Sequence, residues 1–246
     1  MRDDLGIDVD VPERVDRIVS LVPSLTESVA STGKLVGATD WCTHPEDLDV
    51  TRVKGTKNPD VAKIVALKPD VVLANFEENR EPDLQALRDQ GIAVWVTRIR
   101  TVEEAFESLG RMFEQACRTP KPSWLGEAER VWGDLPQAGR RRTAVIPIWR
   151  RPWMVVGSGT FTGDVLRRLG IDNLYEGHEE RYPKVPVDEL VGRGPDLVIL
   201  PDEPYMFTAE DGPECFPGQQ VVLVSGRYLT WYGPSLVEAP AALAID

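Results

Sequence analysis

Large aromatic side chains gather in the segments that the sequence predicts to be loops. They follow predicted strands and do not fall at the apolar positions of predicted helices. Rings of this kind suit flat or apolar ligands, because each offers a large contact area with few rotatable bonds. We therefore interpret the set as the wall of a ligand site, although any one ring could instead fill a gap between a loop and a sheet. The set comprises Trp41, Trp149, Trp153, Tyr182, Tyr205, Trp231 and Tyr232.

Cys42 and His44 are the residues that could carry nucleophilic or metal chemistry. They lie two positions apart in one predicted loop, and His178 is the only other histidine of the chain. A zinc site or a cysteine–histidine pair needs further ligands or an orienting partner, which the sequence does not offer nearby. We expect no catalytic residue, and we retain His44 as a polar contact or as a single axial ligand of a bound metal chelate. A hydrogen-bonded surface histidine is the alternative for His44.

Charged residues near the aromatic rings could bind the polar groups of a ligand. Asp202 and Glu203 follow a predicted buried strand, and Arg181 directly precedes an aromatic residue. They could contact a ligand, pair with each other, or remain solvated. The run Gly157-Ser158-Gly159-Thr160 could hold an anion at a helix start. It lacks the lysine and the third glycine of phosphate-binding loops, which favours a structural role.

Two similar α/β halves must position these loops. Apolar runs typical of buried strands occur at 18–22 (IVSLV), 70–74 (DVVLA), 144–148 (AVIPI) and 196–200 (DLVIL), and helical patterns alternate with them. This alternation predicts parallel sheets, in which ligands lie outside the carboxyl ends of the strands. Ser24 and Glu27 have the spacing of a capping box, so we expect Ser24 to cap the first helix.

The segment 101–136 has no counterpart elsewhere in the chain. Its first half predicts a helix with one apolar face over residues 102–116, and Pro120 and Pro122 break that pattern. Its second half predicts a helix from Trp124 to Leu135, roughly 18–20 Å long at about 1.5 Å per residue. We expect residues 1–118 to form an N-terminal α/β lobe, 119–138 a connecting helix, and 139–246 a C-terminal α/β lobe.

Composition and charge narrow the possible functions. The chain of 246 residues has a formal charge of −12, which argues against a nucleic-acid partner, because binding of the phosphate backbone needs a basic face. It has no apolar run of the ~20 residues that a membrane span needs, and its acidic start lacks the apolar core of a signal peptide. As written, we expect a cytoplasmic monomer with no intrinsic cofactor. A start that lies further upstream would instead allow a periplasmic protein.

Six segments carry a pattern that spans most of the chain. In the first half these are RIVSLVPSLTESVASTGKLVGATDWCTHP, KIVALKPDVVLANFEENR and TVEEAFESL. In the second half they are IWRRPWMVVGSGTFTGDVLRRLGIDNLY, RYPKVPVDELVGRGPDLVILPDEPY and WYGP. Together they resemble the helical-backbone, or class III, periplasmic binding proteins, which are the substrate-binding subunits of ABC importers for cobalamin, iron–siderophores and haem. The resemblance implies two Rossmann-like α/β lobes with parallel sheets, a single connecting helix, and a ligand groove between the lobes. It implies a binding protein and not an enzyme.

The resemblance also assigns roles to individual residues. Trp41 and Tyr182 match aromatic residues that hold the corrin in cobalamin-binding members, and the segment Arg227–Tyr232 matches the late groove segment. Thr56 stands where those members carry a tryptophan, so that part of the wall differs.

Docking onto an ABC permease is a further implication. Importer-coupled members carry one acidic residue on each lobe for this purpose. Asp188 matches the position on the second lobe, whereas the matching position on the first lobe is Ala62, with Asp60 nearby. An ABC permease is therefore the macromolecular partner that the resemblance implies, with Asp60 and Asp188 as the docking residues.

The leading hypothesis is non-catalytic binding of a metal chelate. A corrinoid is favoured, because flat aromatic residues dominate and strong cationic anchors for a triscatecholate are few. A ferric siderophore or haem is the alternative ligand, and a cytoplasmic enzyme of cofactor salvage on the same two-lobe frame is the alternative from another class. The predicted ligand contacts are Trp41, His44, Thr56, Trp149, Trp153, Tyr182, Glu203, Arg227, Trp231 and Tyr232, with Arg181 as a further polar contact.

Overall fold

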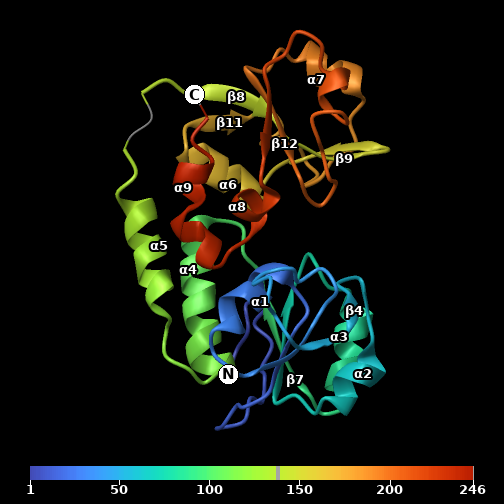
Figure 1. Cartoon of the computed structure of the whole chain (residues 1–246), viewed down its shortest axis with the longest axis vertical. Helices are drawn as coiled ribbons and strands as arrows, with labels where there is room; N and C mark the ends of the chain where they lie inside the picture. Colours follow the sequence, from blue (N-terminus) through green and yellow to red (C-terminus); the bar gives the residue numbers. More distant parts are fainter. Residues whose placement is uncertain (137–138, 246) are drawn as a thin grey trace. The chain divides into compact units, whose positions relative to one another are not determined.

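Short runs of β-branched and aliphatic residues build two parallel sheets in the computed structural model of the protein, which describes residues 1–136 and 139–245 (Figure 1). Each sheet belongs to its own α/β unit. Unit 1 comprises Met1–Ile99, Glu103–Gly126 and Tyr232–Pro234, and unit 2 comprises Arg100–Val102, Glu127–Trp231 and Ser235–Asp246. The predicted fold class, two α/β lobes with parallel sheets, is confirmed.

The sheet of unit 1 has five parallel strands in the order β3–β2–β1–β6–β7. The central strands β1 and β6 are buried over their whole length. A strand covered on both faces is apolar throughout, which is why the sequence predicts these two strands well. The strands are β1 (Ile18–Ser20), β2 (Leu35–Ala38), β3 (Thr51–Arg52), β6 (Val71–Asn75) and β7 (Ala93–Thr97); a small antiparallel hairpin, β4 (Lys54–Gly55) and β5 (Asn58–Pro59), lies outside the sheet.

Helices α2 (Val61–Ala66) and α3 (Glu81–Arg88) cover one face of this sheet. Their side chains Ile64, Leu84 and Leu87 are buried against residues of β1, β6 and β7. Helix α1 (Pro23–Ala30) packs against β1 and β2. Unit 1 is therefore a layered α/β structure, as the alternation of strands and helices predicts.

Helices α4 (Val102–Arg111) and α5 (Ser123–Gly133) contribute residues to both units. A π-helical turn, Met112–Ala116, continues α4 and is buried on one side. Of the predicted connecting segment 119–138, the last two residues lie outside the described residues. In the part of the chain that the structure describes, no helix combines the length and apolar character needed to cross a bilayer.

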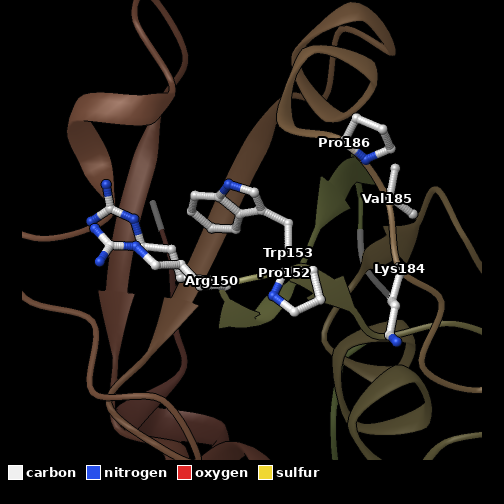
Figure 2. Close-up of a pocket in the computed structure, with 7 residues that line it drawn as sticks. Arg150, Pro152, Trp153, Lys184, Val185 and Pro186 are labelled. Atoms are coloured by element: carbon white, nitrogen blue, oxygen red, sulfur yellow. The ribbon is translucent and has the colours of Figure 1, made fainter.

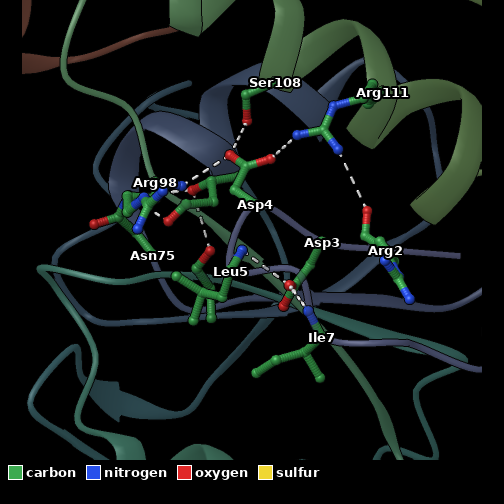
Figure 3. Close-up of polar contacts among 11 residues, drawn as sticks. Arg2, Asp3, Asp4, Leu5, Ile7, Asn75, Arg98, Ser108 and Arg111 are labelled. Atoms are coloured by element: carbon green, nitrogen blue, oxygen red, sulfur yellow. Dashed lines mark hydrogen bonds and ion pairs between the residues drawn. The ribbon is translucent and has the colours of Figure 1, made fainter.

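The acidic start of the chain is a folded part of unit 1. The carboxylate of Asp4, only 6% exposed, accepts hydrogen bonds from the backbone N–H of Arg98 (2.8 Å) and from Ser108 Oγ (2.5 Å). It also pairs with the guanidinium of Arg111 (Figure 3). One buried carboxylate thus joins the N-terminal segment to the end of β7 and to α4.

The sheet of unit 2 has four parallel strands in the order β11–β8–β12–β13. Its core contains the buried side chains Val145, Val198 and Leu200, together with Tyr175 and Phe216. The strands are β8 (Arg142–Val145), β11 (Ile171–Asn173), β12 (Leu197–Pro201) and β13 (Val221–Val224). The helices are α6 (Phe161–Arg168), α7 (Val187–Gly192), α8 (Gly226–Thr230) and α9 (Ala239–Ala242), with 3-10 turns at Pro213–Cys215 and Pro234–Val237.

Asp164, in the first turn of α6, holds the start of α4. Its Oδ2 accepts from the backbone N–H of Val102 (2.9 Å) and from Arg168 Nε (2.8 Å), and its Oδ1 pairs with Arg167. Burial by itself would raise the pKa of this carboxyl. The hydrogen bonds from Val102 and the two arginines outweigh burial and hold the pKa of Asp164 below its usual value.

Several local predictions are wrong, each for a physical reason. Ser24 does not cap α1: the helix begins at Pro23 after an extended Val22, and both Ser24 and Glu27 are buried within it. Proline suits this first position because it has no N–H to satisfy. The predicted strand 144–148 ends at Val145, where the chain leaves the sheet. Thr160, by contrast, caps α6 by accepting from Gly163 N (3.1 Å), so the predicted structural role of that run is confirmed.

Two predicted helices also differ from those observed. The helix predicted to reach Leu135 ends at Gly133. The predicted terminal helix from Ser235 to Leu243 is divided into the 3-10 turn Pro234–Val237 and α9. Pro240 lies in the first turn of α9, where its missing N–H is tolerated. In a helix that began at Ser235 it would lie in the interior and could not donate the required hydrogen bond, so the two segments are separate.

Candidate functional site

The strand order places one topological switch point in each sheet. In unit 1 the chain passes from β1 to β2 on one side and from β6 to β7 on the other, so the switch point lies between β1 and β6. In unit 2 the corresponding point lies between β8 and β12. Open α/β sheets bind ligands outside the carboxyl ends of the strands at such points. Most of the predicted contact residues follow these strands or their neighbours.

Trp41 is the most exposed of the predicted contacts in unit 1, with 67% of its surface open to solvent. It follows β2 and lies against the β4–β5 hairpin, because a Cβ atom on Gly55 would come within 3.2 Å of Trp41 Nε1. Glycine at position 55 therefore lets the indole lie close to the backbone. An indole this exposed contributes little to the core and is available to a ligand.

Asn79 fixes the hairpin at the carboxyl edge of the sheet. Its buried Nδ2 donates to the carbonyl oxygens of Leu21 (3.3 Å) and Thr56 (3.0 Å), and its Oδ1 accepts from Asn75 N (2.9 Å). These partners lie after β1, in the hairpin, and at the end of β6. Thr56, which the sequence predicts at the ligand wall, is held at this edge by its backbone.

Phe76 belongs to the candidate site, although the sequence prediction omits it. It directly follows β6, its N–H donates to Thr97 O (2.9 Å), and half of its surface (50%) is exposed. Two glutamates follow it, which gives the segment the composition of a solvated loop. Its position is nevertheless of the same kind as that of Trp41, a large apolar residue after a parallel strand.

Tyr232, another predicted wall residue, belongs to unit 1 and is only 7% exposed. Its phenol lies beside the side chains of Ser24 and Thr97, and burial raises the pKa of Tyr232. Ser28 Oγ, on α1, donates to the carbonyl oxygen of Tyr232 (3.5 Å). Trp231, in unit 2, is also buried, at 5% exposure. Both rings are covered side chains here, whereas Trp41 and Phe76 are open.

Five aromatic residues of unit 2 form one connected cluster, namely Trp149, Trp153, Tyr205, Phe207 and Phe216. The chain leaves β8 into an antiparallel hairpin, β9 (Pro147–Arg150) and β10 (Trp153–Val155), which carries Trp149 and Trp153. Trp153 stacks on Phe207, with ring centroids 5.9 Å apart and planes at 9°, and meets Phe216 edge to face at 5.4 Å. Trp149 meets Tyr205 edge to face at 5.6 Å and remains 41% exposed. The loop after β12 and the hairpin after β8 thus meet at the switch point.

Arg150 joins the same two segments electrostatically. Its guanidinium pairs with the carboxylates of Asp211 and Glu214, and Tyr205 Oη donates to Asp211 Oδ2 (2.5 Å). The Arg150 side chain is mostly covered (14% exposed), which makes such charge-assisted contacts stronger than on an open surface. The aromatic and ionic contacts together hold the long loop after β12 against the hairpin.

A pocket of about 580 Å³ opens beside Trp153 (Figure 2). An indole, two prolines and Val185 supply its apolar surface, and basic side chains flank it. The full lining is Arg150, Arg151, Pro152, Trp153, Lys184, Val185 and Pro186. Pockets of this size accommodate small organic ligands, or part of a larger one.

The remaining predicted contacts are found near strand ends and are partly exposed. The ring of Tyr182 lies 5.8 Å from the guanidinium of Arg181, and His44 Nδ1 lies 3.1 Å from Thr43 Oγ1. Gly226, the neighbour of Arg227, packs directly on Glu203, because a Cβ atom at position 226 would overlap the Glu203 side chain. The guanidinium of Arg227 lies 5.2 Å from the ring of Tyr228.

The candidate catalytic groups are engaged structurally. Cys42 is fully buried, its Sγ lies 3.0 Å from Thr26 Oγ1 and 3.1 Å from Thr39 Oγ1, and burial raises the pKa of the thiol. A neutral, covered thiol is a poor nucleophile. Asp202 Oδ1 accepts from Gly226 N (2.6 Å) and so stabilises a turn. Among residues 1–136 and 139–245, no group of three or more His, Cys, Asp or Glu is placed to hold a metal ion.

The two predicted docking residues differ in their surroundings. Asp60 caps α2 by accepting from Lys63 N (3.1 Å) and pairs with Lys54 Nζ (3.1 Å), and these contacts lower the pKa of Asp60. Asp188, in the first turn of α7, is exposed. Asp188 is therefore the better placed of the two to meet a partner.

Comparison with known proteins identifies relatives over most of the chain. A family model described as "Periplasmic binding protein" matches residues 18–212. The "Vitamin B12-binding protein" of Vibrio vulnificus (strain YJ016) is 23% identical over 198 residues, which are 76% of this chain and 71% of the relative. The protein of the same name from Salmonella typhimurium is 26% identical over 194 residues, covering 75% of this chain and 71% of the relative.

Solved structures share the fold at low sequence identity. The periplasmic vitamin B12-binding protein of Vibrio cholerae superimposes with a TM-score of 0.72 at 19% identity, over 94% of this chain and 95% of that one. The periplasmic heme-binding protein RhuT from Roseiflexus gives 0.75 at 15% identity, over 94% and 98%. The Helicobacter pylori protein CeuE gives 0.82 at 15% identity, over 99% and 86%.

Proposed function

The chain belongs to the periplasmic binding protein family, and we propose that it binds a metal chelate without transforming it, with a corrinoid as the favoured ligand. The observation that carries the proposal is the exposure of large aromatic side chains after strands of both sheets, with Trp41 at 67% and Trp149 at 41%. Large exposed apolar groups at a switch point support a binding role. The curated relatives named for vitamin B12 support a corrinoid in particular.

Visible spectroscopy tests this proposal directly. Titration with aquocobalamin, with hemin and with a ferric catecholate should give a saturable shift of the absorption bands for the ligand that binds. A matched titration of tryptophan fluorescence should saturate at the same concentration, because exposed indoles would be covered. Absence of any saturable change with all three would refute the proposal. Saturation with hemin or the ferric chelate alone would replace the corrinoid by the alternative ligand.

We propose His44 as an axial ligand of the bound metal, and this role has a separate test. Its imidazole is partly exposed in the loop after β2 that also carries Trp41. His44→Ala should remove the spectral change that accompanies imidazole coordination of cobalt or iron while leaving most of the affinity. Thr43→Ala is the matched control, because Thr43 contacts the imidazole without being able to replace it. An unchanged spectrum in His44→Ala would show that His44 is not a ligand.

We further propose that the protein acts outside the cytoplasm and delivers its ligand to an ABC permease. The family description and the periplasmic relatives support this location. Asp188, exposed on α7, is the favoured docking residue, and Asp60 contributes less because it already caps α2. Fractionation of the source cells checks the location. A cytoplasmic protein with unaltered ligand binding would refute the importer role alone.

A further inference from the structure

We infer that the pocket beside Trp153 recognises negatively charged groups on the periphery of the ligand, a phosphodiester or carboxylates, through Arg151 and Lys184. This inference rests on the proposed function, because it concerns the same bound ligand. Neither cation is among the contacts that the sequence predicts. The ligand that this pocket fits is a planar body with an anionic edge.

The backbone holds both cations beside the indole. Arg151 lies in the turn of the β9–β10 hairpin, two residues before Trp153. Lys184 forms an antiparallel bridge with Met154, and Val185 N donates to Trp153 O (3.1 Å), so the segment of Lys184 extends the hairpin on its other side. Figure 2 shows the indole of Trp153 between Arg150 and the segment from Lys184 to Pro186. The positions of the two cations are therefore set by strand pairing.

The two cations differ from their neighbour Arg150 in having no internal partner. Arg150 is neutralised by Asp211 and Glu214. Arg151 and Lys184 are exposed and make no ion pair or side-chain hydrogen bond within residues 1–136 and 139–245. The chain has a formal charge of −12, yet no carboxylate among the residues that the structure describes pairs with these two. Two uncompensated cations at the rim of one pocket create a local field that attracts anions.

The rest of the lining suits a flat, apolar body. One face of the Trp153 indole is stacked on Phe207, which fixes the ring as a rigid wall. Pro152, Pro186 and Val185 add apolar surface without flexible side chains. A ligand that rests on this wall brings its edge to the two cations. Guanidinium and ammonium groups bind phosphodiester and carboxylate oxygens with charge-assisted hydrogen bonds.

Two pairs of probes separate the charge from the planar body. Cobalamin carries a phosphodiester that cobinamide lacks together with the rest of the nucleotide, and hemin carries two carboxylates that its dimethyl ester lacks. We expect the member with the anionic group to bind roughly tenfold or more tightly than its partner in at least one pair, and its affinity to fall as salt screens the charges. A salt-sensitive preference in the first pair that is lost in the charge-removing variants identifies a phosphodiester as the recognised group, and such a preference in the second pair identifies carboxylates.

Charge-removing variants tie the preference to this pocket. Arg151→Gln and Lys184→Gln should each weaken the preferred charged probe about 5- to 10-fold and change its neutral partner less than about twofold. Arg151→Lys keeps the charge and should restore most of the affinity. Arg140→Gln, an exposed cation of unit 2 outside the pocket, is the matched control and should have no effect.

The possible failures are distinguishable. If the charged and neutral probes bind equally, or if both glutamine variants retain the preference, the inference is wrong while the proposed function stands. If none of the four probes binds the unaltered protein, the inference is wrong, and the proposed function fails as well only if the ferric catecholate also gives no saturable change. Thermal unfolding of each variant verifies that the fold is retained, as expected for exposed side chains.

Discussion

Replacement of Trp41 by alanine is expected to weaken ligand binding and to leave the fold intact. The residue is 67% exposed, and its indole nitrogen lies close to the backbone of Gly55. Substitutions of exposed side chains that support no cap, buried network or strained backbone usually change stability by less than about 0.5 kcal/mol. An effect of this variant on affinity can therefore be separated from an effect on folding.

The size of the binding loss follows from the area that a ligand could still cover. A tryptophan buries about 150–250 Å² when fully enclosed, so a residue that is two-thirds open has roughly 100–170 Å² left to cover. At about 25 cal/mol per Å² this corresponds to about 2.5–4 kcal/mol. Ordering the side chain costs about 0.5–1.5 kcal/mol of that gain. The net loss, about 1–3 kcal/mol, predicts affinity lower by about 5- to 150-fold.

Calorimetric titration with the ligand identified by spectroscopy measures this loss. Ile7→Ala is the matched control, because Ile7 is also an exposed apolar residue of unit 1 (38%) but lies in the N-terminal segment. The control should bind as the unaltered protein does. If Trp41→Ala binds within twofold of the unaltered protein, the indole is not a ligand contact and the argument from exposure fails.

Three further substitutions test the framework around the site. Asp164→Asn should lower the free energy of unfolding by about 1–3 kcal/mol at neutral pH, as measured by urea unfolding. The pKa of Asp164 in the folded protein lies below the usual 3.8. The loss of stability should therefore stay constant above about pH 4 and shrink as the pH falls through the folded-state pKa. Asp4→Ala should cost about 2–4 kcal/mol in the same assay, because three donors lose a carboxylate that is 6% exposed, and a loss below 0.5 kcal/mol would contradict that assignment. Gly55→Ala would place a Cβ atom in overlap with Asn58 Oδ1 and 3.2 Å from Trp41 Nε1, so it should shift both side chains and weaken binding about 2- to 10-fold. Asn58→Ala in the same background removes the tighter contact, and full affinity of Gly55→Ala would show that the position of the indole does not matter for binding.

The elements that sequence predicts best are those whose environment is uniform along their length. β6 and β12 are buried on both faces at every position, so their apolar runs are sufficient to locate them. The fold class follows from their alternation with helices. The strand predicted over 144–148 shows the limit of this reasoning. Its first apolar residues belong to β8 of the sheet and the later ones to β9 of the hairpin. The composition does not show that the chain leaves the sheet after Val145.

Features that depend on tertiary contacts are not visible in the sequence. The acidic start of the chain has the composition of a solvated segment, yet Asp4 is buried by Ser108 and Arg111, about a hundred positions further along. Ser24 has the spacing of a cap, but the helix starts at Pro23, with Val22 at the cap position, so Ser24 lies inside the helix. Local patterns report local preferences: distant partners override them at Asp4, and an adjacent proline overrides them at Ser24.

The candidate site was predictable where a residue type and a strand end coincide. Trp41, Trp149 and Trp153 follow from that rule, and Phe76 obeys it too but is followed by two glutamates. Exposure was not predictable, because it depends on what packs over the ring. Trp231 and Tyr232 belong to the same sequence pattern as Trp41 and are nevertheless covered.

The two units differ in how their aromatic residues are divided between folding and binding. In unit 1 the open rings, Trp41 and Phe76, lie outside the core cluster, so they can change without disturbing the sheet. In unit 2 the ring that lines the pocket, Trp153, also packs on Phe207 and Phe216, so its replacement would open a cavity in the core. In unit 2, therefore, only side chains at the rim of the pocket can be substituted with little loss of stability. Arg151 lies at this rim. This constraint gives a physical reason why the rim would recognise the charge of the ligand and the aromatic rings its shape.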